Sequence, residues 1–170
     1  MKWCITEDLE LRLVNELDAL AMSEVTGEVP HEECLSWIRT LLDYHAKGEG
    51  IPCGIWVRGE LAGYLILEIH ANRNGLFHYG LLPAFRGQGW VTLACSFMVE
   101  YAFNELGLDV VKVDPLAANM ASCRVAERIG FRRVGTMTVP SGDGGTLDIA
   151  RYRLTAPEWQ HLSVASRNAP

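Results

Sequence analysis

The sequence predicts an α+β domain in which a mixed sheet is flanked by helices. Three strand-like segments follow one another between Ile51 and Leu82 with only short polar turns between them, which is typical of an antiparallel meander. A long, largely apolar helix follows at Trp90–Leu106, and strands and helices alternate after it. A chain of 170 residues is the size of one ordinary core, so we expect a single domain over residues 1–170.

The residues before the meander predict one strand and two helices. Leu9–Leu13 alternates apolar and polar residues, as a half-buried strand does. The apolar spacing becomes helical from Leu17 and continues to Glu24. Pro30 then begins a second helix, which Gly48 is placed to end.

The meander itself predicts three strands. Ile51–Val57 and Leu61–His70 flank a turn at Arg58-Gly59-Glu60. The third strand, Leu76–Leu82, follows a polar turn at Ala71–Gly75.

The remaining residues predict alternating helices and strands. The helix Trp90–Leu106 has apolar residues on more than one face, so we expect it to be deeply buried, with Gly107 ending it. After it we expect a strand at Asp109–Val113, a helix at Asn119–Ile129, a strand at Phe131–Val139, a turn at Ser141–Gly145 and a strand at Thr146–Leu154. The predicted order is β-α-α-β-β-β-α-β-α-β-β.

Composition excludes several classes of protein. Hydrophobic residues at 49% and charged residues at 21% exclude an intrinsically disordered or collagen-like chain. The net charge of −6 disfavours non-specific nucleic-acid binding; it suits a cationic partner and serves solubility equally well. Five scattered cysteines without a C-x-x-C pair argue against a disulfide framework and a zinc site. The cysteine pattern fits a reducing cytoplasm, and no stretch approaches 18 uninterrupted apolar residues. From these observations together we expect a cytoplasmic protein without metal, nucleic-acid or membrane partners.

A glycine-rich turn joins the meander to the long helix. Gly87 and Gly89 lie between the strand that ends at Leu82 and the helix that begins at Trp90. The first N–H groups of a helix are unpaired and lie at the positive end of its dipole, and glycines let that backbone close on a ligand. The turn therefore predicts a phosphate or pyrophosphate site, where Arg86 either adds a positive charge or fixes the loop.

Two other interpretations of this turn remain open. Gly87-x-Gly89 could begin a dinucleotide fingerprint, with Asp109 or Asp114 binding a ribose. Against it, Thr92 occupies the third glycine position and the turn follows an antiparallel meander. The turn could also be purely structural.

Two motifs resemble those of a known family. Arg86-x-x-Gly89-x-Val91 resembles the Q/R-x-x-G-x-G/A signature of the GNAT acetyltransferases, with Val91 where that family has Gly or Ala. The segment Asn119–Phe131 is similar to the N-x-x-S…K/R-x-G-F signature of the RimJ/RimL-like branch. The opening at residues 9–13 and the ending at residues 152–159 are also similar to that branch, so the resemblance covers nearly the whole chain in order.

The resemblance implies a GNAT-like fold and acetyl-CoA as cosubstrate. In that fold a mixed, mostly antiparallel central sheet is flanked by helices, and the fourth and fifth strands splay apart to admit acyl-CoA. Backbone groups of Leu81 and Leu82 would hold the pantetheine arm and the thioester, and N–H groups from Gln88 to Val91 would cradle the pyrophosphate. The expected cofactor-binding residues are Leu81, Leu82, Arg86, Gly87, Gln88, Gly89, Trp90, Val91, Asn119 and Ser122.

Asn119 and Ser122 also have a plain structural interpretation. Asn119 can cap its helix, and Ser122 then lies in the first turn. A cap does not exclude a contact with the cofactor. By resemblance, Asn119 faces the cofactor arm and the Ser122 hydroxyl could donate to the departing thiolate.

Acyl transfer to nitrogen requires a neutral amine, so a base is expected on the acceptor side. If Leu65, Leu67 and Ile69 face one side of their strand, Glu68 and His70 face the other. We therefore take Glu68 as the leading base and His78, on the neighbouring strand, as the next candidate; the plain alternative is solvated polar side chains. The expected catalytic residues are Ser122 and Glu68.

We expect an N-acetyltransferase that moves an acetyl group from acetyl-CoA to a primary amine by direct attack. The acceptor would be a protein N-terminal α-amine or a small amine, with specificity in the helical pair Asn15–Gly48 and the hairpin around Ser141–Gly145. The alternatives are a non-catalytic acyl-CoA-sensing module and a transferase of a larger acyl group such as succinyl. Homodimers occur in this family, so a homodimer is left open.

Overall fold

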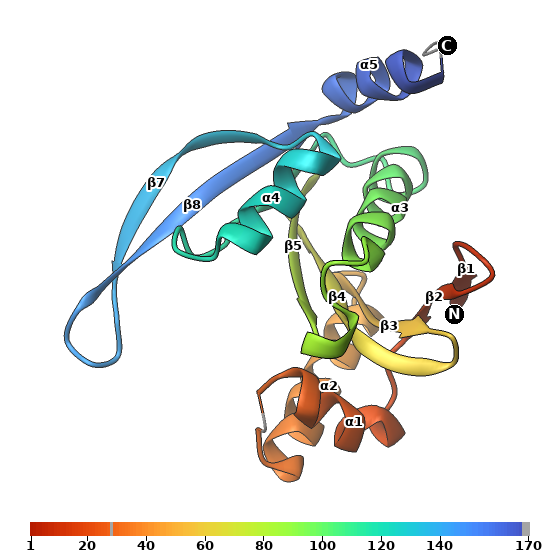
Figure 1. Ribbon diagram of the computed structural model, residues 1–170, viewed down its shortest axis with the longest axis vertical. Coiled ribbons are helices and arrows are strands. Elements are labelled where there is room, and N and C mark those ends of the chain that lie inside the picture. The colour runs from red at the N-terminus through yellow and green to blue at the C-terminus, as the bar shows by residue number, and fades with distance from the viewer. Residues whose placement is uncertain (28, 168–170) are drawn as a thin grey trace.

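The computed structural model describes residues 1–27 and 29–167 and builds them into one eight-stranded sheet with helices on both faces (Figure 1). The strands are β1 (Lys2–Cys4), β2 (Leu9–Leu13), β3 (Gly50–Val57), β4 (Glu60–His70), β5 (Asn74–Leu81), β6 (Val110–Val113), β7 (Arg132–Pro140) and β8 (Thr146–Thr155). The helices are α1 (Ala19–Val25), α2 (His31–Ala46), α3 (Trp90–Asn104), α4 (Met120–Ile129) and α5 (Ala156–Arg167), with short 3-10 turns at η1 (Glu16–Asp18) and η2 (Pro83–Phe85).

The strand order confirms the predicted fold class. The sheet runs β1-β2-β3-β4-β5-β6-β8-β7, and every neighbouring pair is antiparallel except the parallel pair β5 and β6. Each predicted element is present within a few residues of its expected bounds; α3, for example, ends at Asn104 rather than Leu106. Two elements were not predicted, the short edge strand β1 and the C-terminal helix α5.

The sheet parts between β5 and β6. Their pairing begins at Asn74 with Val110 and ends at Phe77 with Val113, where β6 stops. Strand β5 continues to Leu81 and stays paired with β4 throughout. Beyond Phe77, therefore, β5 has a strand partner on one side only, and the sheet opens on the side of β6.

The two faces of the sheet pack against different helices. Leu65, Leu67 and Phe77 belong to a large buried cluster that includes Met98 of α3 and Ala126 of α4. On the opposite face, α1 and α2 form a smaller cluster to which Tyr64 of β4 contributes. Strand β4 thus sends alternate side chains into two separate cores, and α3 is as deeply buried as predicted.

Strands β7 and β8 form a long hairpin that projects away from the helices (Figure 1). Helix α5 begins directly after β8 with a capping box. The Glu158 carboxylate accepts hydrogen bonds from the Thr155 N–H (2.8 Å) and hydroxyl (2.7 Å), while the Glu158 N–H donates to the same hydroxyl. Across the described residues, no helix has both the length and the apolar character needed to cross a bilayer.

Candidate active site

The turn between β5 and α3 is held in a conformation that requires glycine. Gly87 and Gly89 have φ angles of +74° and +85°, in the left-handed region that L-residues avoid. A Cβ at either position would meet nothing within 4 Å, so the requirement comes from the backbone angle rather than from crowding. The space beside the glycines is open to a ligand. Gly89 is the residue before α3, and no side-chain cap occupies the first N–H groups of that helix.

Side chains of the turn hold it in place. The Arg86 Nε donates to the Leu81 carbonyl at 2.9 Å, and the Gln88 amide donates to the Ala84 carbonyl at 3.1 Å. Gln88 also accepts a hydrogen bond from the Trp90 indole at 3.3 Å. Of the two roles expected for Arg86, fixing the loop is the one for which the structure provides a contact.

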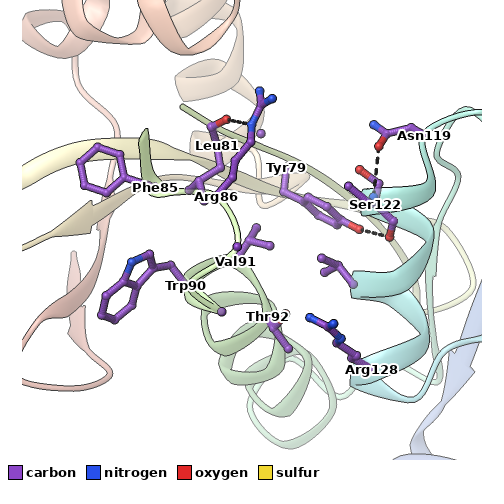
Figure 2. Close-up of a pocket in the computed structure, with 15 residues that line it drawn as sticks. Tyr79, Leu81, Phe85, Arg86, Trp90, Val91, Thr92, Asn119, Ser122 and Arg128 are labelled. Carbon is purple, nitrogen blue, oxygen red and sulfur yellow. Dashed lines mark hydrogen bonds between the residues drawn. The ribbon is translucent and has the colours of Figure 1, made fainter. Parts of the chain in front are cut away.

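A cavity of about 260 Å³ lies between this turn and α4 (Figure 2). One wall is made by Leu81, Phe85, Arg86, Gly87, Gly89 and the first turn of α3, Trp90 to Thr92. The facing wall comes from α4, including Asn119, Ser122, Val125 and Arg128. Arg128 points toward Thr92 across the cavity in Figure 2, which puts a positive charge at this end.

The start of α4 is fixed by its cap and by a contact from β5. The Asn119 side chain accepts a hydrogen bond from the Ser122 N–H at 3.1 Å, which confirms the expected cap. The Tyr79 phenol donates to the Ser122 carbonyl at 3.0 Å (Figure 2). Burial raises the pKa of Tyr79, so its phenol stays protonated and keeps this bond. The Ser122 hydroxyl is not used by either contact.

The backbone groups of Leu81, the last residue of β5, and of Leu82 point in different directions. The Leu82 N–H donates to the Ala62 carbonyl of β4 at 2.8 Å, and its carbonyl accepts from the Phe85 N–H at 3.0 Å. Backbone groups alternate sides in an antiparallel pair, so those of Tyr79 and Leu81 point away from β4, into the opening left by β6. The Leu81 carbonyl accepts from Arg86, so its N–H is the backbone group available to a ligand in the opening. The backbone of Leu82 is engaged within the chain, and its side chain lines a separate cavity with Glu24 and Val25.

A second cavity, of about 160 Å³, lies on the other side of the opening. Tyr64, His78 and Asp114 line it, and Tyr79, Asn119 and Ser122 line both cavities. The Tyr64 ring lies over Gly80, where a Cβ would come within 2.6 Å of it. The two cavities therefore meet at Tyr79, Asn119 and Ser122, between the two halves of the sheet.

Glu68 lies behind this second cavity rather than in it. Its Oε1 is 2.9 Å from His78 Nε2 and its Oε2 is 3.3 Å from His70 Nε2. Glu68 and the two histidines share a face, as predicted, but only His78 lines the cavity. The two imidazoles contact different carboxylate oxygens. Nowhere in residues 1–27 and 29–167 do three His, Cys, Asp or Glu side chains converge as a metal site would require.

The structure thus brings most of the expected residues together. Leu81, Arg86, Gly87, Gly89, Trp90, Val91, Asn119 and Ser122 all line the first cavity. Gln88 braces the turn, and Leu82 and Glu68 lie outside. The two segments expected to wall the acceptor side are 15–48 and 141–145, and none of their described residues lines either cavity. Helix α2 contacts the second cavity only indirectly, because Trp37 packs against Tyr64, which lines it.

Some lining residues were not predicted. On α4, Ala121, Val125 and Arg128 follow one another at helical spacing and line the first cavity together. That spacing could have identified them once Asn119 was taken as the cap. Asp114 was considered only as a ribose ligand, because its approach to His78 depends on the parallel pairing of β5 and β6, which local sequence does not reveal.

Comparisons with known proteins agree with this geometry. Residues 6–132 match the acetyltransferase (GNAT) domain family. The chain is 33% identical over 121 residues (68% of its length) to YdaF of Bacillus subtilis (strain 168), whose name assigns it provisionally as a ribosomal N-acetyltransferase. It is 33% identical over 131 residues (66% of its length) to the FsC-acetyl coenzyme A-N(2)-transacetylase of Aspergillus fumigatus. The matched segments span 65% and 54% of those relatives, less than two thirds of either.

Solved structures agree with the fold. RimL, a ribosomal L7/L12 α-N-protein acetyltransferase in complex with coenzyme A, superposes with a TM-score of 0.83 at 20% identity, covering 91% of this chain and 98% of that one. This likeness concerns the fold. With the family match over residues 6–132, it leads to one conclusion: the chain belongs to the GNAT acetyltransferase family.

Proposed function

We propose that this chain is an N-acetyltransferase that moves an acetyl group from acetyl-CoA to a primary amine by direct attack, with residues 1–170 acting as one domain. Family membership supports the reaction class, and the two cavities that meet in the opened sheet support a ternary complex of donor and acceptor. We also propose a cytoplasmic location, where acetyl-CoA is available and the buried thiols of Cys34, Cys53, Cys95 and Cys123 stay reduced.

The first cavity is suited to acetyl-CoA. The left-handed glycines and the N-terminus of α3 offer N–H groups and a positive dipole to a diphosphate, and Arg128 adds a charge at the far wall. The Leu81 N–H points into the opening, where a pantetheine arm or a thioester carbonyl could accept from it. When bound, acetyl-CoA supplies the activated acetyl thioester.

The second cavity is suited to an amine. The Nε2–H of His78 donates to the Glu68 carboxylate, so Nδ1 is the ring nitrogen that can accept a proton. When Nδ1 takes that proton, the negative charge of Glu68 stabilises the imidazolium. The His78 side chain is 45% exposed and can pass that proton to water. We therefore assign the base to His78 and a positioning role to Glu68.

Ser122 is suited to the leaving group because its hydroxyl lies where the two cavities meet. In the reaction the amine nitrogen loses two protons, the C–N bond forms and the C–S bond breaks. One proton leaves through His78 to solvent. The other ends on the coenzyme A thiol, with the Ser122 hydroxyl donating to the sulfur as it departs.

The observation that carries this proposal is the meeting of the two cavities at Tyr79, Asn119 and Ser122. The test is acetyl-CoA-dependent thiol release with two sets of acceptors and a no-acceptor control. One set contains short peptides with free N-termini; the other contains polyamines, amino acids and aminoglycosides. We expect acetylation of at least one set, identified by mass.

Two results would count against the proposal. Binding of acetyl-CoA, measured by calorimetry, without turnover in either set would favour a sensing module. Turnover with succinyl-CoA and none with acetyl-CoA would retain the transferase and change the acyl group.

A further inference from the structure

Asp114 faces His78 across the opening of the sheet, and this follows from strand register. Phe77 and Val113 are the last paired residues of β5 and β6, and both are buried in the core shared with α3 and α4. Side chains alternate along a strand, so His78 and Asp114, one residue further, project to the opposite face. Both line the second cavity, together with Tyr64 of that same face.

The second cavity has an ionisable side chain on each side, His78 from β5 and Asp114 from the end of β6. On the β5 side, His78 is held by Glu68. On the β6 side, the Asp114 carboxylate takes part in no ion pair among the described residues. None of the nine residues that line the cavity is a lysine or an arginine. A half-buried carboxylate in such a cavity favours a positive partner from outside the chain.

A second ammonium on the acceptor fits this arrangement. Neighbouring strands lie about 4.8 Å apart where they pair, and β5 and β6 diverge from there. A chain of three or four carbons separates two nitrogens by roughly 5–6 Å at bond lengths of about 1.5 Å. One nitrogen can then lie beside His78 while the other binds Asp114. A peptide N-terminus instead presents a carbonyl oxygen near the amine, and a carboxylate repels it.

We propose that the acceptor is a compact diamine or polyamine whose second, protonated nitrogen binds Asp114 while the reacting nitrogen lies at His78. This inference rests on the proposed acetyltransferase function. Asp114 is a specificity-determining residue in this arrangement and moves no proton.

The test compares acceptors in matched pairs. Steady-state kinetics would use 1,3-diaminopropane and putrescine against propylamine and butylamine, with a short free-N-terminal peptide as a third class. We expect wild-type kcat/KM to be at least tenfold higher for each diamine than for its monoamine. Asp114→Asn should raise the diamine KM at least tenfold and leave both monoamine values within twofold. Asp109→Asn is the control and should change neither; Asp109 is exposed, directly precedes β6 and pairs with Arg73.

The outcomes separate this inference from the function beneath it. A loss of kcat for all acceptors alike in Asp114→Asn would make Asp114 a base and overturn the anchoring role. Preference of the wild type for the peptide, or equal rates with diamines and monoamines, would overturn the substrate class while the acetyltransferase function stands. If none of the acceptors gave thiol release above the no-acceptor control, the proposed function itself would be overturned. Circular dichroism of both variants would verify folding.

Discussion

The phenol of Tyr79 donates to the backbone carbonyl of Ser122 at 3.0 Å and thereby joins β5 to the first turn of α4 where the sheet has opened. Since β5 and β6 no longer pair at this level, the bond is one of the contacts that set the position of α4 relative to β5. Burial raises the pKa of Tyr79, so the bond is present throughout the physiological pH range. The position of Ser122 is therefore fixed through its own main chain, and neither contact uses its hydroxyl.

Ser122→Ala should reduce kcat about 10²-fold or more and change the KM for acetyl-CoA less than twofold, because the hydroxyl serves the departing sulfur rather than binding. The measurement is steady-state kinetics at saturating acceptor. Ser96→Ala, in α3 and outside both cavities, is the matched control. An unchanged kcat in Ser122→Ala would remove the acid role.

His78→Gln should lower kcat/KM about 10²-fold or more, because the proposed proton acceptor is lost. Glu68→Gln should have a smaller effect, since the base remains and loses its orienting carboxylate. His70→Gln is the control: it contacts the other oxygen of Glu68 and does not line the cavity. If Glu68→Gln were the more damaging change and His78→Gln nearly silent, Glu68 itself would be the base.

Gly89→Ala should weaken acetyl-CoA binding at least tenfold, because an L-residue at φ +85° strains the turn that presents the α3 N-terminus. Gly144 provides a close control, with φ +86° and nothing within 4 Å, in the hairpin turn far from both cavities. Each alanine should cost about 1–2 kcal/mol of stability, seen in denaturant unfolding. Calorimetry with acetyl-CoA should separate the two variants, and equal affinities would disprove the loop assignment.

Glu158→Gln should destabilise the protein by about 1 kcal/mol at neutral pH, because a neutral amide replaces the charged carboxylate that accepts from Thr155 and pairs with Arg132. Hydrogen bonds from Thr155, together with Arg132 nearby, lower the pKa of Glu158 to about 2. The folded pKa lies below the unfolded one, so the stabilisation is fully present above about pH 4.5 and is lost as the pH falls toward 2. Urea unfolding at a series of pH values should show the advantage of the wild type over Glu158→Gln shrinking over that interval.

Local pattern was sufficient for most of the fold. The meander, the long apolar helix and the final hairpin each have a periodicity or a turn that predicts them, and all are present. The three-residue strand β1 is too short to show a period. The start of helix α5 does have a sequence signal, the capping box of Thr155 and Glu158. That signal directly follows the alternating pattern of β8 with no turn residue between them, so the pattern alone does not separate the helix from the strand.

The site was predictable where it is local and not where it depends on the packing of distant strands. The glycine turn and the cap at Asn119 are short motifs with one physical meaning each. Leu82 was expected to behave as Leu81 does, but which of two consecutive residues turns its backbone to the opening is decided by pairing with Ala62. Asp114 reaches the site only through the register of Phe77 with Val113.

The parting of β5 and β6 also has a consequence for stability, because few pairings join the two parts of the sheet. The strands before the opening and those after it share four paired positions, from Asn74 with Val110 to Phe77 with Val113. A molecule that lies in the opening contacts both sides and braces them against separation. A ligand at a hundred times its Kd adds about 2.7 kcal/mol to the stability of the state it binds. A ligand held between β5 and β6 should therefore raise the temperature of thermal unfolding, by an amount that grows with its concentration.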